Sequence, residues 1–242
     1  MRVAGRVAAQ THDYLATLAH PGITTLELDK AAESFIRSKG CLPACLNYHG
    51  FPNTMCVSVN DEVVHCLPNN RPLQDGDIMT LDFGAIYEDF YSDTAKTYLI
   101  GNVSEAHRKL TTVCYEALWK GIEQVKEGNS VLDISKPIQY HIDNSGFGVV
   151  KEYVGHGIGR TMHEEPKIPN WVPPAGKPSP KLTAGMVICI EPIITENKIP
   201  VLTKHSEWDI RTTNGDWAAH FEHTIALLPT GYEVLTLREE EK

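Results

Sequence analysis

This chain of 242 residues lacks a long apolar run, an excess of basic charge and an export signal. No apolar run approaches the roughly 18 residues that a membrane-spanning helix requires, so we expect no membrane partner. The net charge of −9 argues against nucleic acid as the main partner. The first residues, MRVAGRVAAQTHDYL, contain no serine and no continuous apolar core, which argues against a mitochondrial or secretory targeting segment.

The cysteines lack the paired spacing of a structural zinc site. There are six, and four of them fall in one short region, where only Cys41 and Cys45 have C-x2-4-C spacing and no second pair follows. Disulfides are rare in proteins without an export signal. We therefore expect reduced, mostly buried thiols in a cytoplasmic protein.

Apolar periodicity and capping residues indicate helices followed by strands in each half of the chain. This order predicts an α+β fold and one domain, residues 1–242, whose two halves leave a cleft between their sheets. The expected helices are Arg2 to Leu18, Thr24 to Gly40 (with Thr24 and Glu27 as a capping box), Ser104 to about Lys126, and Ser130 (with Asp133) to about Asn144. The expected strands are Met55 to Val59, Ile78 to Ala85, Phe90 to Leu99, Val149 to Val154, Met186 to Ile193 and Phe221 to Leu228, the last of the chain.

Two further stretches are expected at the surface. The Pro- and Gly-rich segment 168–185 should form a loop. The terminal REEEK, residues 238–242, should form a solvated, fraying tail.

The stretch TLDFGAIYEDFYSDTAKTY places two aspartates where a sheet face is expected. If its strands fold about Tyr87 and Glu88, with a turn around 87–89, Asp82 lies directly opposite Asp93. Directly opposed side chains have Cβ atoms roughly 4.5–5.5 Å apart, and like charges at that spacing destabilise a sheet. A shared proton, a basic side chain or a metal cation would compensate.

Polar residues also interrupt apolar or glycine-rich segments further along the chain. His156 lies between two glycines in EYVGHGIGRTMHEEP, which does not continue into a helix as a nucleotide-binding loop would. Glu191 interrupts GMVICIEPII, and Glu222 lies at the head of the last expected strand, in AAHFEHTIALL. Any one of these is compatible with an ion pair or a strand end, but a buried unpaired carboxylate is costly or stays protonated.

Together, these carboxylates and the histidine form a set of hard oxygen donors with one nitrogen. Such a set suits two divalent first-row metals better than one tetrahedral zinc, which recruits more nitrogen or sulfur. Two such ions about 3.5–4 Å apart share bridging carboxylates and activate a water molecule. We therefore favour a cation as the compensator of Asp82 and Asp93, because the odd spacing of Lys96 from Asp93 points the lysine to the other face.

The same residues lie in segments that resemble the type I methionine aminopeptidases, of the pita-bread metallopeptidase fold shared with creatinase and the prolidases. The matching segments are MRVAGR, YHGFPNTMCVSVNDEVVHCLP, LDFGAIYEDFYSDTAKTY, GHGIGRTMHEEP, GMVICIEP and FEHT. The resemblance implies two pseudo-symmetric halves, each with helices outside a curved antiparallel sheet. It implies two divalent ions (cobalt, manganese, ferrous iron, zinc or nickel) held by Asp82, Asp93, His156, Glu191 and Glu222, with Asp93 and Glu222 bridging.

The resemblance also implies the reaction, which is removal of the initiator methionine from nascent proteins and peptides with a small second residue. Glu191 would be the general base, His163 would stabilise the oxyanion, and His65 would contact the substrate near its amino end. A neutral imidazole can donate to charge that develops only in the transition state.

A methionine pocket of apolar and polarizable side chains is implied as well. Met162 stands in it where the family typically has phenylalanine. Asn60 and Glu62 match a loop whose backbone carbonyls hold a monovalent cation, sodium or potassium. The implied pocket residues are Cys45, Tyr48, Phe51, Cys56, Met162 and Trp208.

Two alternatives remain at the level of the sequence. An Xaa-Pro aminopeptidase or a prolidase-type dipeptidase shares the fold but normally carries a large additional amino-terminal domain. A binding protein that had lost its metals would be expected to lack part of the ligand set. The resemblance favours a monomeric cytoplasmic enzyme with transient ribosome contact, in a family where a dozen or so residues usually precede the MRVAG helix.

Overall fold

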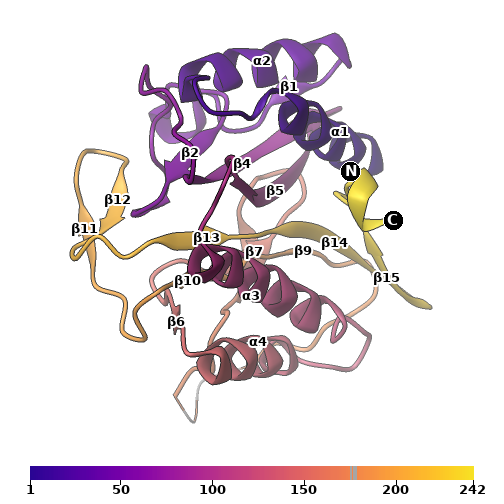
Figure 1. Ribbon diagram of the computed structural model, residues 1–242. Helices are drawn as coiled ribbons and strands as arrows, with labels where there is room; N and C mark the ends of the chain where they lie inside the picture. The colour runs from indigo at the N-terminus through magenta and orange to yellow at the C-terminus, as the bar shows by residue number, and fades with distance from the viewer. Residues whose placement is uncertain (175, 177–178) are drawn as a thin grey trace.

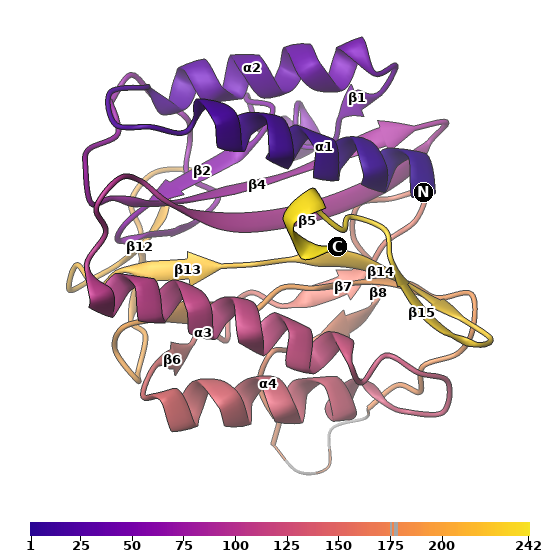
Figure 2. The same ribbon diagram turned by 45° about the vertical axis from the view of Figure 1, so that its right-hand side comes forward.

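Helices cover the strands from two sides in the computed structural model, which describes residues 1–174, 176 and 179–242. Figure 1 shows one helix pair above the strands and the other pair below, and Figure 2 shows the same layers from the side. The upper pair is α1 (Arg2–Leu18) and α2 (Thr25–Ser38), and the lower pair is α3 (Glu105–Ile122) and α4 (Val131–Ser145). The expected helices are confirmed, although α3 ends about a turn early. No helix in the described part of the chain has the length and apolarity that crossing a membrane requires.

Capping explains where two of these helices begin. The Thr24 hydroxyl accepts from the Glu27 backbone N–H while the Glu27 carboxylate accepts from the Thr24 backbone, so the predicted capping box of α2 is present. At α4 the Asp133 carboxylate accepts from both the backbone N–H and the hydroxyl of Ser130, each at 2.8 Å. Pairs of this kind satisfy amide groups that the first helical turn leaves without a partner.

In the first half, β4 is the centre of an antiparallel sheet and pairs with β1, β2 and β5. The strand β3 leaves this sheet and pairs with β12 (Ile210–Thr212) of the second half. The bounds are β1 (Leu42–Pro43), β2 (Cys56–Val59), β3 (Glu62–Val64), β4 (Ile78–Tyr87) and β5 (Phe90–Leu99).

The second half contains a sheet of order β15-β14-β9-β7-β8 and two smaller sheets, β13-β10-β6 and β11-β12-β3. Three expectations are corrected here: the strand expected at Val149 to Val154 is only β6, the strand expected at Met186 to Ile193 breaks at Glu191, and β15 follows β14. The bounds are β6 (Gly148–Val149), β7 (Gly155–Gly157), β8 (Glu164–Ile168), β9 (Val187–Ile190), β10 (Ile193–Thr195), β11 (Leu202–Lys204), β12 (Ile210–Thr212), β13 (Ala218–His220), β14 (His223–Leu228) and β15 (Gly231–Val234).

The register of the β4–β5 hairpin differs from the prediction. Tyr87 pairs with Phe90, so the turn contains only Glu88 and Asp89, which both have positive φ, as two-residue hairpin turns of type I′ require. Asp82 therefore faces Ala95, and the prediction that it lies directly opposite Asp93 is wrong. The two aspartates are diagonal neighbours on one face of the sheet, which still brings their carboxylates together.

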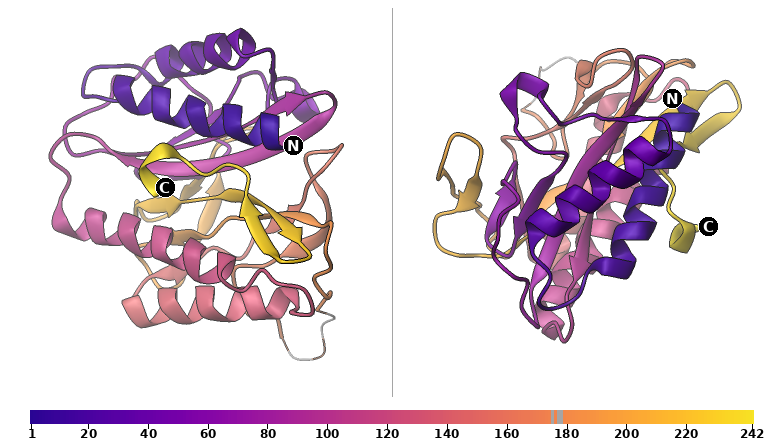
Figure 3. Two further views of the ribbon diagram at one scale, coloured as in Figure 1. Left: turned by 90° about the vertical axis from the view of Figure 1, so that its right-hand side faces the viewer. Right: turned by 90° about the horizontal axis from the view of Figure 1, so that it is seen from above.

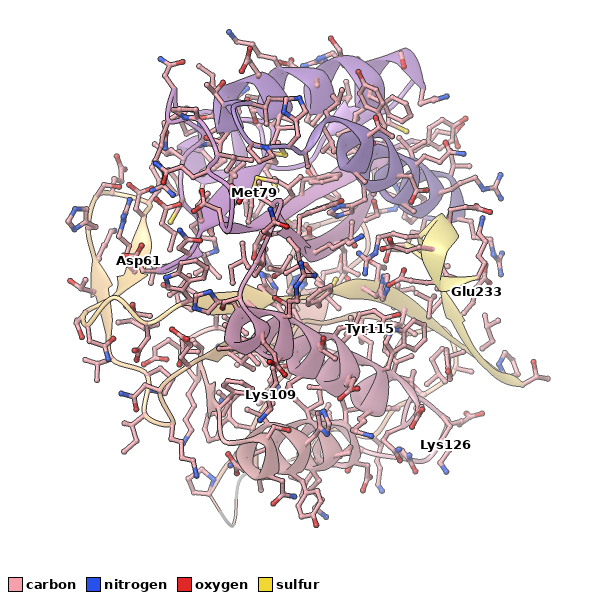
Figure 4. The ribbon with its side chains drawn as sticks, viewed as in Figure 1. Asp61, Met79, Lys109, Tyr115, Lys126 and Glu233 are labelled. Carbon is pink, nitrogen blue, oxygen red and sulfur yellow. The ribbon has the colours of Figure 1, made fainter. Side chains whose placement is uncertain are left out.

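The two halves meet where β5 passes β14. The Glu222 backbone N–H donates to the Ala95 carbonyl at 2.9 Å, and the Thr224 hydroxyl donates to the Asp93 carbonyl at 2.7 Å. One apolar cluster lies under α1 and α2 and another under α3 and α4. Figure 4 labels Met79 on β4 in the upper layer and Tyr115 on α3 in the lower layer, with side chains filling the space around the strands.

The carboxyl-terminal segment corrects another expectation. Arg238 is only 1% exposed, and Glu239–Glu241 form a 3-10 turn, so residues 238–242 are not a solvated, fraying tail. Figure 3 shows this segment folded back along the body of the molecule near α1. The loop expected over 168–185 falls partly outside the described residues, and it anchors itself by burying Asn170 and Leu182. All six cysteines are buried as free thiols, as predicted.

Candidate active site

Three carboxylates from both halves of the chain converge on one point. Asp82 lies in the middle of β4, Asp93 lies on β5 and Glu222 directly precedes β14. One ligand atom from each lies within 4.8 Å of the other two. Asp93 and Glu222 are buried, and Asp82 is half-buried. The β5–β14 junction therefore creates the cluster, because it joins a pair of diagonal aspartates to a glutamate that is distant in sequence.

His156 and Glu191 join this cluster from the second sheet. Nε2 of His156 lies 3.5 Å from Oε1 of Glu191, which is the first residue after β9. Nδ1 of His156 donates to the Gly157 carbonyl at 2.9 Å, which leaves the Nε2 lone pair free to bind a cation. His156 also lies with Glu222 in a second group whose ligand atoms are within 4.8 Å. All five predicted ligands are therefore brought to one site.

The glycines beside His156 allow close strand packing. A Cβ added to Gly157 would lie 2.2 Å from the Glu165 carbonyl oxygen, and one added to Gly155 would lie 2.3 Å from the Cys189 carbonyl oxygen. Both glycines belong to β7, and the next element is the strand β8, so the segment is not a nucleotide-binding loop. The reason for these glycines is thus close backbone approach, which holds the His156 ring at a fixed depth.

The electrostatics of the cluster call for positive charge. Burial, followed by the charge of Asp93, raises the pKa of both Asp82 and Glu222 well above the ordinary range. Burial and then the charge of Asp82 do the same to the pKa of Glu191. Oε1 of Glu222 is buried with no hydrogen-bond partner among the described residues. Two divalent cations would neutralise the four carboxylates and give this oxygen a partner, so the donor set fits such ions.

The sequence analysis missed Cys189. Its thiol is fully buried, and its Sγ lies within 4.8 Å of ligand atoms of His156 and Glu222. Burial, followed by the charge of Glu222, raises the pKa of the Cys189 thiol, so it stays neutral. The sequence did contain a signal for Cys189. Side chains two positions apart on a strand point to the same face, and Cys189 stands two positions before Glu191.

Of the three predicted catalytic residues, Glu191 belongs to this cluster and His163 lies beside His156. His65 lies close enough to His163 for its charge, after burial, to lower the pKa of His65. The ring centroids of His163 and His156 are 4.3 Å apart, and the Tyr48 hydroxyl lies 2.6 Å from Nδ1 of His163. Burial, followed by the charge of His49, lowers the pKa of His163, which is then neutral at neutral pH. His65 has φ 60° and packs edge-on to the Tyr153 ring at 5.2 Å.

The predicted pocket residues share one apolar cluster under α1 and α2. Phe51 is 4% exposed, Met162 is 3% exposed, and the rings of Phe51 and Trp208 meet edge-to-face at 5.2 Å. The cluster members among the pocket residues are Cys45, Tyr48, Phe51, Cys56, Met162 and Trp208. The structure thus builds an apolar wall beside the carboxylates.

The loop expected to hold a monovalent cation is tightly bonded. Asn60 has φ 61°, and its side chain bridges Asp77 and the Ile78 backbone. The Glu62 carboxylate accepts from the Val59 backbone and from Arg211. These bonds fix the direction of the backbone carbonyls in this loop.

Comparison with known proteins gives a match over nearly the whole chain. The model of metallopeptidase family M24 matches residues 1–228. Methionine aminopeptidase 1 of Bacillus subtilis (strain 168) is 45% identical over 236 residues, which are 98% of this chain and 94% of that protein. The crystal structure of methionine aminopeptidase from Rickettsia prowazekii superposes with a TM-score of 0.93 at 38% identity, covering 98% of this chain and 95% of that chain.

The prolidases are more distant. The prolidase from Pyrococcus furiosus superposes with a TM-score of 0.78 at 22% identity, covering 99% of this chain and 63% of that chain. At this identity the match concerns the fold alone.

Proposed function

The chain belongs to metallopeptidase family M24, among its methionine aminopeptidases, and from that premise we propose that it removes amino-terminal methionine at the site built by Asp82, Asp93 and Glu222. The observation that carries the proposal is the convergence of these carboxylates, from both halves of the chain, on a buried point beside an apolar cluster of side chains. The pita-bread fold is common to the prolidases, so the fold alone does not distinguish the two activities.

Five side chains would hold two divalent metal ions. The resemblance to the family implies that Asp93 and Glu222 would serve both ions, and both residues lie where the two halves meet. When bound, the ions activate a water molecule and polarise the substrate carbonyl. The complete set is Asp82, Asp93, His156, Glu191 and Glu222.

Glu191 is the general base in this proposal. Its carboxylate stands beside His156 at the end of β9, where it can accept a proton from the attacking water. It then passes that proton to the amine that leaves.

His163 stabilises the developing oxyanion, and His65 contacts the substrate at its amino end. If the Tyr48 hydroxyl donates to Nδ1 of His163, the imidazole proton stands on Nε2, which is then free to donate to the substrate. The donor is neutral, so its hydrogen bond strengthens mainly as charge develops on the carbonyl oxygen.

The apolar wall would accept the methionine side chain. Cys45, Cys56 and Met162 offer polarizable sulfur, and Phe51 and Trp208 offer aromatic surface to a thioether. A small second residue would fit best, because His65 and His163 stand at the reacting bond. Met162 has a flexible, unbranched side chain where the family typically has the rigid ring of phenylalanine, so the shape of the pocket differs there.

We further propose the oligomeric state, the location and the metal ions of the enzyme. It acts as a monomeric, single-domain enzyme (residues 1–242) in the cytoplasm, on nascent chains and with transient ribosome contact. Backbone carbonyls near Asn60 and Glu62 bind sodium or potassium. Manganese, cobalt, ferrous iron, zinc and nickel are all compatible with the donor set, and availability selects among them.

Competitive cleavage tests the proposal. The protein is stripped of metal, reloaded with manganese and offered Met-Ala-Ser, a Met tripeptide with a bulky second residue, and Ala-Pro. We expect rapid release of methionine from Met-Ala-Ser only. Cleavage of Ala-Pro in preference would contradict the proposal and support the dipeptidase alternative.

A further inference from the structure

Arg238 is buried behind the two carboxylates that bridge in the proposed function. Its side chain is 1% exposed, and Nη2 donates to Oε1 of Glu241, which is 2% exposed, at 2.8 Å. In Figure 2 the C-terminal turn lies over β5, between α1 and the strands of the second half. A charged pair at this depth costs desolvation free energy and is weak evidence for stability alone, so a role in specifying geometry is worth testing.

The contacts of Arg238 fall on the residues that follow the two bridging carboxylates. Thr94 follows Asp93, and His223 follows Glu222. Side chains alternate along a strand, so each successor points away from the metal site while its neighbour points into it. Nη1 of Arg238 donates to the Thr94 hydroxyl at 3.2 Å, and Nη2 donates to Nε2 of His223 at 3.2 Å.

Further hydrogen bonds connect these contacts to the backbone of both strands. Nη1 of Arg238 also donates to the Ala95 carbonyl at 3.3 Å. The Thr94 hydroxyl donates to the carbonyl of Glu222 itself at 2.9 Å. The Arg238 guanidinium therefore connects the main chain of β5 to the main chain at the start of β14. It does so next to Asp93 and Glu222, the two carboxylates that bridge in the proposed function.

Outer contacts attach the turn that carries this pair. The Glu239 backbone N–H donates to Asp13 of α1 at 3.3 Å, and Lys96 of β5 pairs with Glu240. Glu241 is also hydrogen-bonded through Oε2 to the Arg238 backbone at 2.9 Å. Segments far apart in sequence thus meet at the turn that carries Arg238.

We propose that Arg238, fixed by Glu241, is a positioning residue that sets the separation of the Asp93 and Glu222 carboxylates for binding two metal ions. The inference rests on the proposed metal site and adds a residue that touches neither substrate nor metal. Groups behind metal ligands typically change metal affinity or activity 10–100-fold when they are removed.

Two variants test the inference without leaving a charge buried and unpaired. Thr94→Val removes the hydroxyl that connects Arg238 to Glu222 while keeping the side-chain shape. The double variant Arg238→Met, Glu241→Leu removes both charges together, which preserves folding in other proteins with buried pairs. Glu239→Gln is the matched control, because its exposed side chain lies on the same turn and, among the described residues, forms an ion pair only with Lys242.

The measurements are the Kd for manganese by calorimetry, circular dichroism, and kcat and KM for Met-Ala-Ser. We expect both test variants to keep the native spectrum and the KM, with the manganese Kd raised about 10-fold or more. The control should match the wild type. Test variants whose Kd stays within about twofold of the wild type would overturn the inference alone. A wild-type protein that binds no manganese would overturn the proposed site as well.

Discussion

The Tyr48 hydroxyl lies 2.6 Å from Nδ1 of His163, and the rings of the two residues are 5.4 Å apart at their centroids. Tyr48 belongs to the short turn Tyr48–Gly50, whereas His163 directly precedes β8, so the bond joins the two halves across the site. It occupies Nδ1 of His163, so only Nε2 remains for the substrate in the proposed function. Tyr48 therefore has a second role in the proposal, besides lining the methionine pocket.

Replacement of Tyr48 by phenylalanine should mainly affect turnover. Tyr48→Phe keeps the ring in the apolar cluster and removes the hydrogen bond, so kcat for Met-Ala-Ser should fall about 3- to 10-fold with little change in KM, as the loss of about 0.5–1.5 kcal/mol implies. Steady-state kinetics measure both constants. Tyr14→Phe, on α1 and far from His163 in sequence, is the control. An unchanged kcat would show that the bond does not orient His163.

Truncation of Trp208 should weaken methionine binding. Trp208→Ala removes the edge-to-face partner of Phe51, and kcat/KM for Met-Ala-Ser should fall about 10- to 100-fold, since apolar contacts of this size contribute about 1–3 kcal/mol of discrimination. The loss should appear mostly in KM. A loss confined to kcat would place Trp208 outside the methionine pocket.

Gly157→Ala should destabilise the fold and weaken metal binding. The new Cβ would lie 2.2 Å from a backbone oxygen of β8, which side-chain movement cannot relieve, so unfolding free energy should fall by about 1–3 kcal/mol. Gly159→Ala is the matched control, because the atoms nearest to its Cβ belong to the flexible Glu164 carboxylate, at 2.9 Å. Urea unfolding measures the difference. Equal stabilities for the two variants would contradict the argument from close strand approach.

His12 should make the protein sensitive to mild acid. Burial, followed by the charges of Arg238 and Lys96, lowers the pKa of His12 well below its ordinary value. Below about pH 6.5, which is the ordinary pKa of histidine, His12 is protonated in the unfolded chain but stays neutral in the folded protein. Stability should therefore fall by up to about 1.4 kcal/mol per pH unit.

His12→Gln removes this titration and keeps hydrogen-bonding groups near the Tyr98 hydroxyl, which lies 2.8 Å from Nδ1 of His12. Urea unfolding of both proteins from about pH 7.5 to 4.5 gives the comparison. The wild type should lose stability more steeply than the variant below about pH 6.5. Parallel curves would mean that His12 does not contribute.

The sequence was sufficient to single out the residues that we propose as metal ligands. A polar residue inside an apolar strand is visible without a structure, and Asp82, Asp93, Glu191 and Glu222 all carry that signal. The helices could be predicted equally well, because the capping residues Thr24 and Ser130 lie only three positions before their partners Glu27 and Asp133. These features depend on neighbours close in sequence.

The sequence did not predict the register of the β4–β5 hairpin or the contacts between residues far apart in the chain. Glu88 and Asp89 adopt positive φ without the Asn-Gly or Asp-Gly signal of such turns, so the hairpin was folded one residue early and Asp82 was paired with the wrong residue. The charges of REEEK suggested solvation. Arg238 is instead buried and donates a hydrogen bond to Thr94, which lies 144 positions earlier in the chain. No local sequence pattern predicts that contact.

The most direct test of the account is the number of metal ions bound. Wild type and Asp93→Asn are stripped of metal and titrated with manganese by calorimetry, with methionine release from Met-Ala-Ser measured on the same samples. Removal of a bridging carboxylate oxygen should leave the variant with at most one ion, whereas the wild type should bind two and be active only after loading. An active metal-stripped wild type, or a variant that still binds two ions and cleaves normally, would contradict the two-metal site.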